Sequence, residues 1–247
     1  MINNYINKII TKGNGICVIS NIEYGSDKER FDRIKEIYDI CEAKGIDTII
    51  NCGNLSAKFN KQENKTNTEI TNDLIEYITN NHPYSKNIKF YTISGNNEIS
   101  HLEKNNINIC EEIIKKRNDI IYLGDNEVDV VLDDLNVRLS SGKINGELDE
   151  SYNIKKNIKD NSNIDLVCKG PCYSAKHEIL SDTHILCVPS VSDVGGSFFH
   201  IIWLVDTKQK NNINITDFKL ESSYDKKIEE DIKTDETILQ RIMKLHK

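Results

Sequence analysis

Residues 91–100 read YTISGNNEIS, and within them a buried strand ends in polar residues. The first four letters continue an apolar and β-branched run that begins at Ile88, which predicts a strand over 88–94. Gly95 follows at once and allows the backbone to turn tightly. The two asparagines and the glutamate behind it are therefore expected directly beyond the strand end.

The first half of the chain alternates between strand and helix patterns. Short apolar runs predict three further strands, at 15–20, 47–52 and 119–123. Apolar residues recur at helical spacing in three segments between the strands, at 28–44, 68–80 and 107–117. Gly45 follows the first of these as a C-terminal stop signal. This order predicts a parallel sheet with helices packed against it.

The second half has a different pattern, in which short strands follow one another with short turns. The predicted strands lie at 128–132, 137–140, 164–169, 184–189, 198–205 and 213–220, with one helix at about 151–158. We expect these strands to form a mixed or antiparallel sheet. Together the halves predict an α/β fold, a two-sheet mixed β-sandwich flanked by helices. We expect this domain to span 1–221, with a charged C-terminal helical extension over 222–247.

Composition limits the classes of function. The chain has 247 residues and a net charge of −7, which disfavours nucleic acid as a partner. No segment approaches the ~18 consecutive apolar residues that a membrane span needs. The seven cysteines are an odd number, and most sit in apolar runs, which is typical of buried free thiols in a reducing compartment. We therefore expect a soluble cytoplasmic protein.

Polar residues follow five of the predicted strands, at 20–25 (SNIEYG), 53–56 (GNLS), 95–98 (GNNE), 139–142 (LSSG) and 170–173 (GPCY). In open α/β sheets, ligands bind beyond the carboxyl ends of the strands. One such asparagine alone would be interpreted as a turn residue. Five polar strand ends in this order indicate a site.

The five segments resemble the motifs of the calcineurin-like metallophosphoesterase superfamily, which are D-x-H, G-D, G-N-H-[DE], a single histidine and G-H-x-H. The resemblance spans roughly residues 15–195. Between the motifs the chain is similar to phosphoesterases of prokaryotes and their mobile elements, which implies an origin in a prokaryote, a mobile element or a virus. The resemblance also implies a two-sheet sandwich and, in active members, two divalent metal ions such as Mn, Fe or Zn.

The chain departs from the family pattern at the first two motifs. Carried over residue by residue, Asn21 stands for the first aspartate, and Glu23 stands for its partner histidine. Asn54 stands for the aspartate that bridges the two metals.

The third motif keeps only part of its pattern. Asn96 matches the asparagine that binds metal in the family. Asn97 replaces the histidine that protonates the leaving group, and Glu98 fills the carboxylate position behind it.

The last two motifs have lost their histidines. The isolated histidine corresponds to Ser141, with Ser140 as a close alternative. The final pair becomes Pro171 and Tyr173, with Cys172 between them. Of the seven metal ligands that the family implies, only Asn96 remains.

These departures predict that no metal is bound. Two cations about 3.5–4 Å apart need a bridging carboxylate to offset their repulsion, and Asn54 carries no charge. No imidazole remains at the motif positions to bind Mn, Fe or Zn. We therefore expect no cofactor and no catalytic residue, and interpret the chain as a pseudo-phosphoesterase that binds or scaffolds a protein partner.

Two other interpretations stay open. In the first, Glu23, Glu98, Cys172 and Tyr173 form a rebuilt hydrolase site with one metal or none, in which His177 is the nearest base to Cys172. In the second, the chain binds nucleic acid through a basic groove. That groove would need Lys104, Lys115, Lys116 and Arg117, which also fit the solvated face of a helix.

Overall fold

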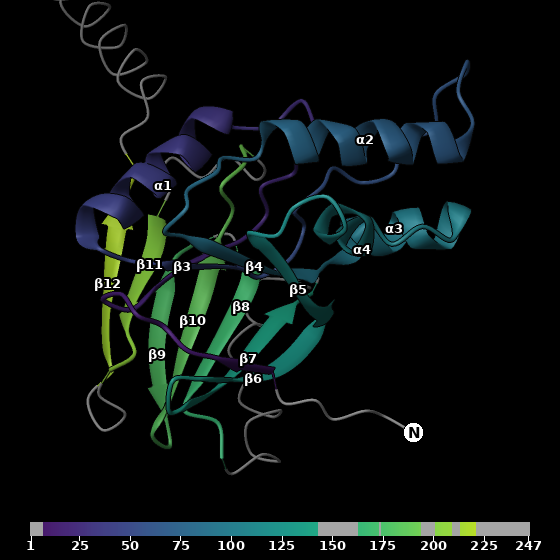
Figure 1. Ribbon diagram of the computed structural model, residues 1–247. Coiled ribbons are helices and arrows are strands. Elements are labelled where there is room, and N and C mark those ends of the chain that lie inside the picture. Colours follow the sequence, from purple (N-terminus) through teal and green to yellow (C-terminus); the bar gives the residue numbers. More distant parts are fainter. Residues whose placement is uncertain (1–6, 143–162, 173, 194–200, 209–212, 221–247) are drawn as a thin grey trace, which may run out of the picture.

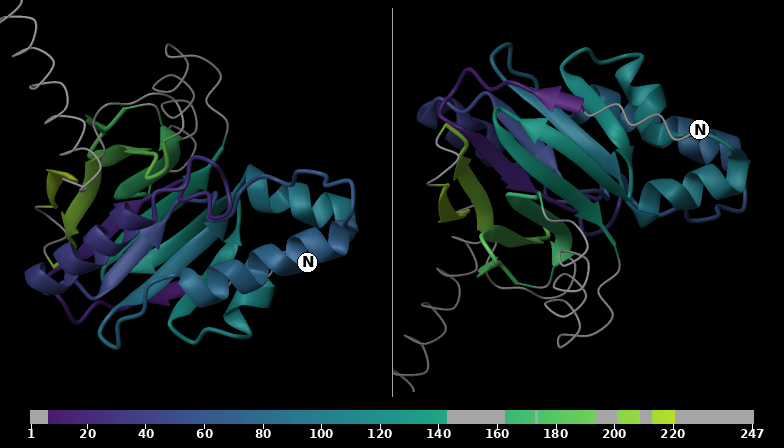
Figure 2. Two further views of the ribbon diagram at one scale, coloured as in Figure 1. Left: turned by 90° about the horizontal axis from the view of Figure 1, so that it is seen from above. Right: turned by 90° about the horizontal axis from the view of Figure 1, so that it is seen from below.

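A computed structural model of the chain describes residues 7–142, 163–172, 174–193, 201–208 and 213–220. Two six-stranded sheets pack face to face, and the helices lie on the outer side of one of them (Figure 1). Seen from above, the helices cover that sheet, and seen from below the strands of the other sheet come to the front (Figure 2). The predicted two-sheet α/β sandwich is confirmed.

The helix-covered sheet has the strand order β12-β11-β2-β3-β4-β5. Its strands β2 to β5 run parallel to one another, as predicted from the first half of the chain. β11 joins β2 in antiparallel direction, and β12 joins β11. The bounds are β2 (Ile16–Ile19), β3 (Thr48–Asn51), β4 (Lys89–Ser94), β5 (Ile120–Asp125), β11 (Ile201–Asp206) and β12 (Asn214–Lys219). The second half of the chain therefore completes the sheet that the first half begins.

The second sheet has the order β1-β6-β7-β8-β10-β9 and is mixed, as predicted. The bounds are β1 (Asn7–Ile9), β6 (Glu127–Leu132), β7 (Leu135–Ser141), β8 (Leu166–Cys172), β9 (Lys176–Leu180) and β10 (Thr183–Pro189). The sequence analysis missed β1 and β9. Both strands are short, and both lie at a sheet edge. An edge strand has a neighbouring strand on one side only, so it is less enclosed and its sequence shows a weaker hydrophobic pattern.

In the described residues, four helices pack on the helix-covered sheet: α1 (Phe31–Lys44), α2 (Asn67–Asn81), α3 (Asn96–Asn105) and α4 (Ile109–Ile114). Gly45 ends α1 in a left-handed conformation, as expected. The helix α3 was not predicted, because its sequence NNEISHLEKN has no continuous apolar stripe. The predicted helices at 151–158 and in 222–247 lie outside the described residues. In the described part of the chain, no helix is long and apolar enough to cross a membrane.

The core has two layers, and each strand of the helix-covered sheet contributes to both. On β2, Cys17 and Ile19 face the helices, while Ile16 and Val18 face the second sheet. This alternation is the two-residue period of a strand buried on both faces. All seven cysteines are free and buried, as the sequence analysis predicted for these thiols.

His82 is a buried polar group of the helix layer with a partner at each ring nitrogen. It follows α2 and is 3% exposed, with its ring packed edge-on against Phe90 at 4.4 Å between centroids. The Tyr24 hydroxyl lies 3.0 Å from Nδ1, and the Tyr38 hydroxyl lies 2.9 Å from Nε2. Burial lowers the pKa of His82 to about 3, with the charge of Arg117 acting in the same direction. The ring is therefore neutral in the folded chain.

This neutral ring makes stability depend on pH. Between pH 6.5 and about 3, the unfolded chain binds a proton at His82 that the folded chain does not. Stability is therefore lost as pH falls through that window, by up to about 1.4 kcal/mol per pH unit from this one group. Urea unfolding of the wild type and of His82→Gln at several pH values should show that the free energy of unfolding falls less steeply with decreasing pH in the variant. A slope left unchanged by His82→Gln would contradict this assignment.

Candidate functional site

The loops after β2 and β3 run side by side beyond the ends of their strands. The backbone N–H of Asn21 donates to the Gly53 carbonyl at 2.9 Å, and that of Glu23 donates to the Asn54 carbonyl at 3.1 Å. Asn21, Glu23 and Asn54 have φ values of 57°, 55° and 54°, in the left-handed region. Asparagine tolerates this region well and glutamate does so rarely. The loops thus present all three side chains from a fixed, tightly curled backbone.

A chain of amide groups connects the predicted site residues, and a backbone group fixes its direction. The N–H of Asn97 donates to Asn54 Oδ1 at 3.2 Å, so the Asn54 amide must turn its Nδ2 the other way. That Nδ2 donates to Asn21 Oδ1 at 2.9 Å. Asn21 Nδ2 in turn faces the hydroxyls of Ser190 and Ser192 at 2.8 and 3.0 Å. Each amide orientation therefore follows from the preceding one.

Asn97 and Glu23 close the network on its outer side. Asn97 Nδ2 donates to the Ser56 carbonyl at 2.9 Å and to Glu23 Oε1 at 3.3 Å. The Ser192 hydroxyl donates to Glu23 Oε2 at 3.1 Å. Asn96, the first residue of α3, is exposed beside this network. Asn96 thus lies at the rim of the network. The structure brings five of the predicted site residues together: Asn21, Glu23, Asn54, Asn97 and Glu98.

Glu98 is a buried carboxylate that accepts four hydrogen bonds. Oε1 accepts from the N–H and the hydroxyl of Ser56, both at 2.7 Å. Oε2 accepts from the N–H of Gly95 at 2.7 Å and from that of Asn54 at 3.2 Å. Burial raises the pKa of Glu98, while the donors from Ser56 and Gly95 act in the opposite direction. The carboxylate ties the start of α3 to the loop after β3, which is a structural position.

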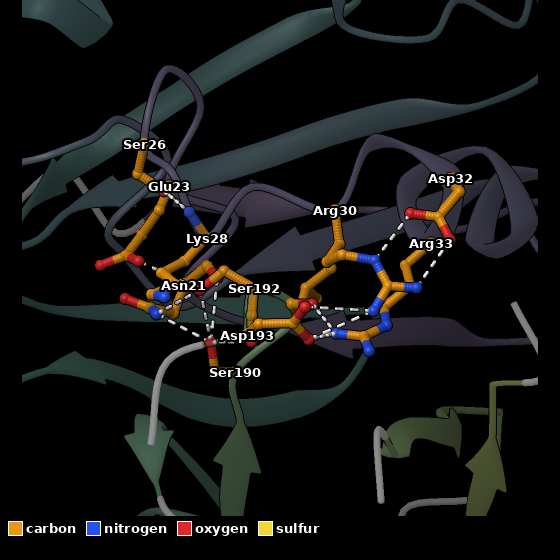
Figure 3. Close-up of polar contacts among 11 residues, drawn as sticks. Asn21, Glu23, Ser26, Lys28, Arg30, Asp32, Arg33, Ser190, Ser192 and Asp193 are labelled. Atoms are coloured by element: carbon orange, nitrogen blue, oxygen red, sulfur yellow. Dashed lines mark hydrogen bonds and ion pairs between the residues drawn. The ribbon is translucent and has the colours of Figure 1, made fainter. Parts of the chain in front are cut away.

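The segment after β10 supplies the two serines, and Figure 3 shows how it is held. Its backbone runs along the loop after β2, since the N–H of Ser192 donates to the Asn21 carbonyl at 3.0 Å. Arg33, on α1 and 1% exposed, donates to the Val191 carbonyl at 2.9 Å and to Asp193 at 2.7 Å. Arg30 also contacts Asp193, at 3.2 Å (Figure 3). The two arginines therefore anchor the serine-bearing segment to α1.

The sequence analysis missed Ser190 and Ser192, although a signal was present. They follow the apolar run HILCVP of β10 in the stretch PSVSD, which is another polar strand end. This strand end lies next to that of β2, because Ser20 and Ser190 form a parallel bridge.

The remaining predicted positions have other surroundings. Ser141 is 5% exposed, and its Oγ has no hydrogen-bond partner among the described residues. It packs on Gly53, where an added Cβ would lie 2.1 Å from that Oγ. The Cys172 thiol donates to the Lys169 carbonyl at 3.2 Å. Pro171 lies on β8, and Tyr173 lies outside the described residues.

The basic residues proposed for a nucleic-acid groove have local partners. Lys115 pairs with Glu112 at 2.5 Å, and Lys116 pairs with Glu76. Arg117 is bound to Asp119 at 2.6 Å and also donates to three backbone carbonyls. Lys104, at the end of α3, is exposed. Three of these four charges are therefore already matched within the helix layer.

This donor set does not fit a pair of divalent metal ions. Cations need lone pairs directed at them, whereas the amide nitrogens of Asn21, Asn54 and Asn97 carry protons and donate them to neighbouring oxygens. The oxygens of Asn21 and Asn54 already accept hydrogen bonds from within the network. Across the described ranges, no group of three or more His, Cys, Asp or Glu side chains could hold a metal ion.

Comparisons with known structures identify the architecture. An archaeal phosphodiesterase superposes with a TM-score of 0.56 at 16% sequence identity, over 83% of this chain and 99% of that one. The chain has the calcineurin-like phosphoesterase fold.

Two further structures resemble the chain less closely. A predicted phosphoesterase of Streptococcus pneumoniae has a TM-score of 0.42 at 12% identity, over 84% of this chain and 98% of that one. Vps29 of Entamoeba histolytica, complexed with zinc, has a TM-score of 0.45 at 11% identity, over 83% and 98% of the two chains. No protein-family model and no curated protein matches the sequence. The assignment of the phosphoesterase fold rests on the archaeal enzyme.

The hydrogen bonds of Glu98 predict a large effect of one substitution. In Glu98→Gln, the new amide nitrogen must face the N–H of either Ser56 or Gly95, since both carboxylate oxygens now accept from backbone donors. We expect the free energy of unfolding to fall by about 2–3 kcal/mol in a urea titration. Glu103→Gln, at an exposed position of the same helix, is the matched control and should change it by less than about 0.5 kcal/mol. Equal stability of the two variants would contradict the role given to Glu98.

Proposed function

We propose that this chain is a catalytically inactive phosphoesterase-fold protein, a pseudo-metallophosphoesterase that acts as a binding or scaffolding module for a protein partner. The observation that supports this most is the amide chain from Asn97 through Asn54 to Asn21. A two-metal phosphoesterase uses its cations to clamp the phosphate and to activate the attacking water. At these strand ends, amides and serines bind one another instead.

Electrostatics supports the same proposal. A bridging carboxylate is what permits two cations to lie close together, and the side chain of Asn54 is neutral. The one fully buried carboxylate of the described network, Glu98, is occupied by four donors. Glu23 is shared between Asn97 and Ser192. The acidic groups thus stabilise the loops and leave no paired carboxylates for a metal.

The rebuilt-hydrolase alternative has less support. If Cys172 is its nucleophile, the thiol needs activation by a base such as His177. The Cys172 thiol donates to a backbone carbonyl, while His177 Nε2 lies 2.9 Å from Nδ1 of His184. The thiol and the imidazole thus each have a different hydrogen-bond partner, which gives this reaction less support than the binding role.

A partner could use two surfaces in this proposal. One is the rim of the amide network, where Asn96 is exposed at the start of α3. The other is the charged segment 222–247, whose apolar residues recur at helical spacing. The buried free cysteines fit a reducing, cytoplasmic setting for such a partner.

Metal content tests the inactive site directly. We expect purified protein, exposed to Mn²⁺ and then desalted, to retain essentially no manganese by elemental analysis, because the network offers no charged pair of ligands. The same sample should not hydrolyse a chromogenic phosphodiester above the rate of a buffer blank. Stoichiometric manganese together with hydrolysis that Asn96→Ala abolishes would overturn the proposal.

Partner capture tests the binding role. The full chain, chain 1–221 and Asn96→Arg serve as three matched baits in extracts of the source organism. We expect a protein that the full chain retains and that one of the two altered baits loses, which also identifies the surface. Equal capture of every protein by all three baits would leave no specific partner and would count against the binding role.

A further inference from the structure

The edge strand β9 exposes a large apolar side chain. β9 pairs with β10 on one side, and in the described part of the chain no strand pairs with its other side (Figure 1). Ile179 on this strand is 62% exposed. It shares a face with His177, which stands opposite Leu186 of the core between the sheets. Ile179 therefore lies on the inner face of the sheet, yet more than half of its surface reaches solvent.

The turn after β9 fixes which of its backbone groups point outward. Residues 181–182 both have positive φ, 48° and 69°, as in a two-residue type I′ hairpin. The residues that flank such a turn exchange hydrogen bonds, so the N–H and C=O of Leu180 face β10. The direction alternates along a strand. The N–H and C=O of Ile179, His177 and Ala175 therefore point away from β10, along the open edge.

An edge of this kind is a template for another strand, and many proteins protect it with a lysine. β9 carries Lys176, but Glu178 lies on the same face two residues further on and forms an ion pair with it. The order Lys-His-Glu is therefore self-complementary. When a second β9 lies antiparallel with His177 opposite His177, each Lys176 stands opposite a Glu178. The charges that would disfavour many strands thus favour a second copy of this one.

We propose that two copies of this chain associate through β9, antiparallel about a two-fold axis at His177, so that their second sheets become one continuous sheet. The outward groups of Ala175, His177 and Ile179 supply the main-chain hydrogen bonds. Lys176 and Glu178 then occupy the positions without main-chain bonds, where opposing side chains come closest. Ile179 of each copy packs beside Ala175 of the other, which covers the exposed apolar surface.

The geometry also determines the strength and size of the assembly. One pair of short strands buries less surface than a stable protein interface, so the association is weak and depends on concentration. Both copies use the same strand, which makes the interface isologous. Each β9 edge is consumed by the other, and association through it therefore stops at two chains.

Sedimentation equilibrium of the untagged full chain in reducing buffer tests the dimer. We expect the average mass to rise from 28.3 kDa toward twice that value as the protein concentration increases. Ile179→Pro removes an N–H that points away from β10, so the hairpin is kept while the new strand pair is blocked, and this variant should remain a monomer. A wild type that stays at 28.3 kDa at every concentration would overturn the proposal, as would a dimer that Ile179→Pro leaves unchanged.

Charge variants separate contacts between copies from contacts within one copy. Lys176→Glu makes both facing side chains acidic and Glu178→Lys makes both basic, so each variant alone should dimerise about ten-fold more weakly or worse. An equal mixture of the two should recover dimerisation, because opposite charges again face each other across the interface. Neither chain regains its internal ion pair in that mixture. Circular dichroism checks that each variant is folded, and a mixture that associates no better than its components would overturn the proposal.

This inference goes beyond the proposed binding role, since β9 carries none of the motif residues. A monomeric wild type would refute the dimer and leave the inactive site standing, whereas manganese bound at that site would do the reverse. The other occupant of the edge is a strand of a different protein. A wild type that sediments as a monomer, with a captured partner that Ile179→Pro loses, would assign β9 to that protein and overturn the dimer.

Discussion

The buried carboxylate of Glu98 is the constraint on which the rest of the amide network depends. Its four donors fix the loop after β3 against the first turn of α3, and that loop carries Asn54. Asn54 receives a hydrogen bond from the same helix and passes the orientation on to Asn21. Asn21 then faces the serines after β10. One charged group at a helix start thereby orders four strand ends, which in an active two-metal enzyme the cations would help to connect.

The sequence predicted the architecture well where apolar periodicity was strong. The runs that became β2 to β5 are buried on one or both faces, so their hydrophobic patterns were continuous. Prediction failed for α3, whose exposed positions interrupt its apolar stripe, and for the edge strands β1 and β9. It also expected the first half of the chain to form one parallel sheet and the second half to form another, mixed or antiparallel sheet. That β11 returns to pair with β2 depends on long-range packing, which local pattern does not encode.

The location of the amide network was predictable, while its internal bonding was not. Parallel strands end at one edge, so the polar residues after β2, β3 and β4 had to meet there. Which way each amide points depends on a single backbone N–H, that of Asn97, and on two serines contributed from far along the chain. Ser141 is a second example of bonding that the sequence did not predict. It packs against Gly53, and its hydroxyl has no hydrogen-bond partner among the described residues.

The return of β11 to β2 also has a consequence for how the chain is made. β2 begins at Ile16, yet its antiparallel neighbour starts only at Ile201. Contacts so distant in sequence are slow to form, because a long loop must close before they stabilise anything. On the ribosome, β2 waits with one side unpaired until nearly the whole domain has emerged. A nascent chain of this kind depends on protection of that exposed edge during most of its synthesis.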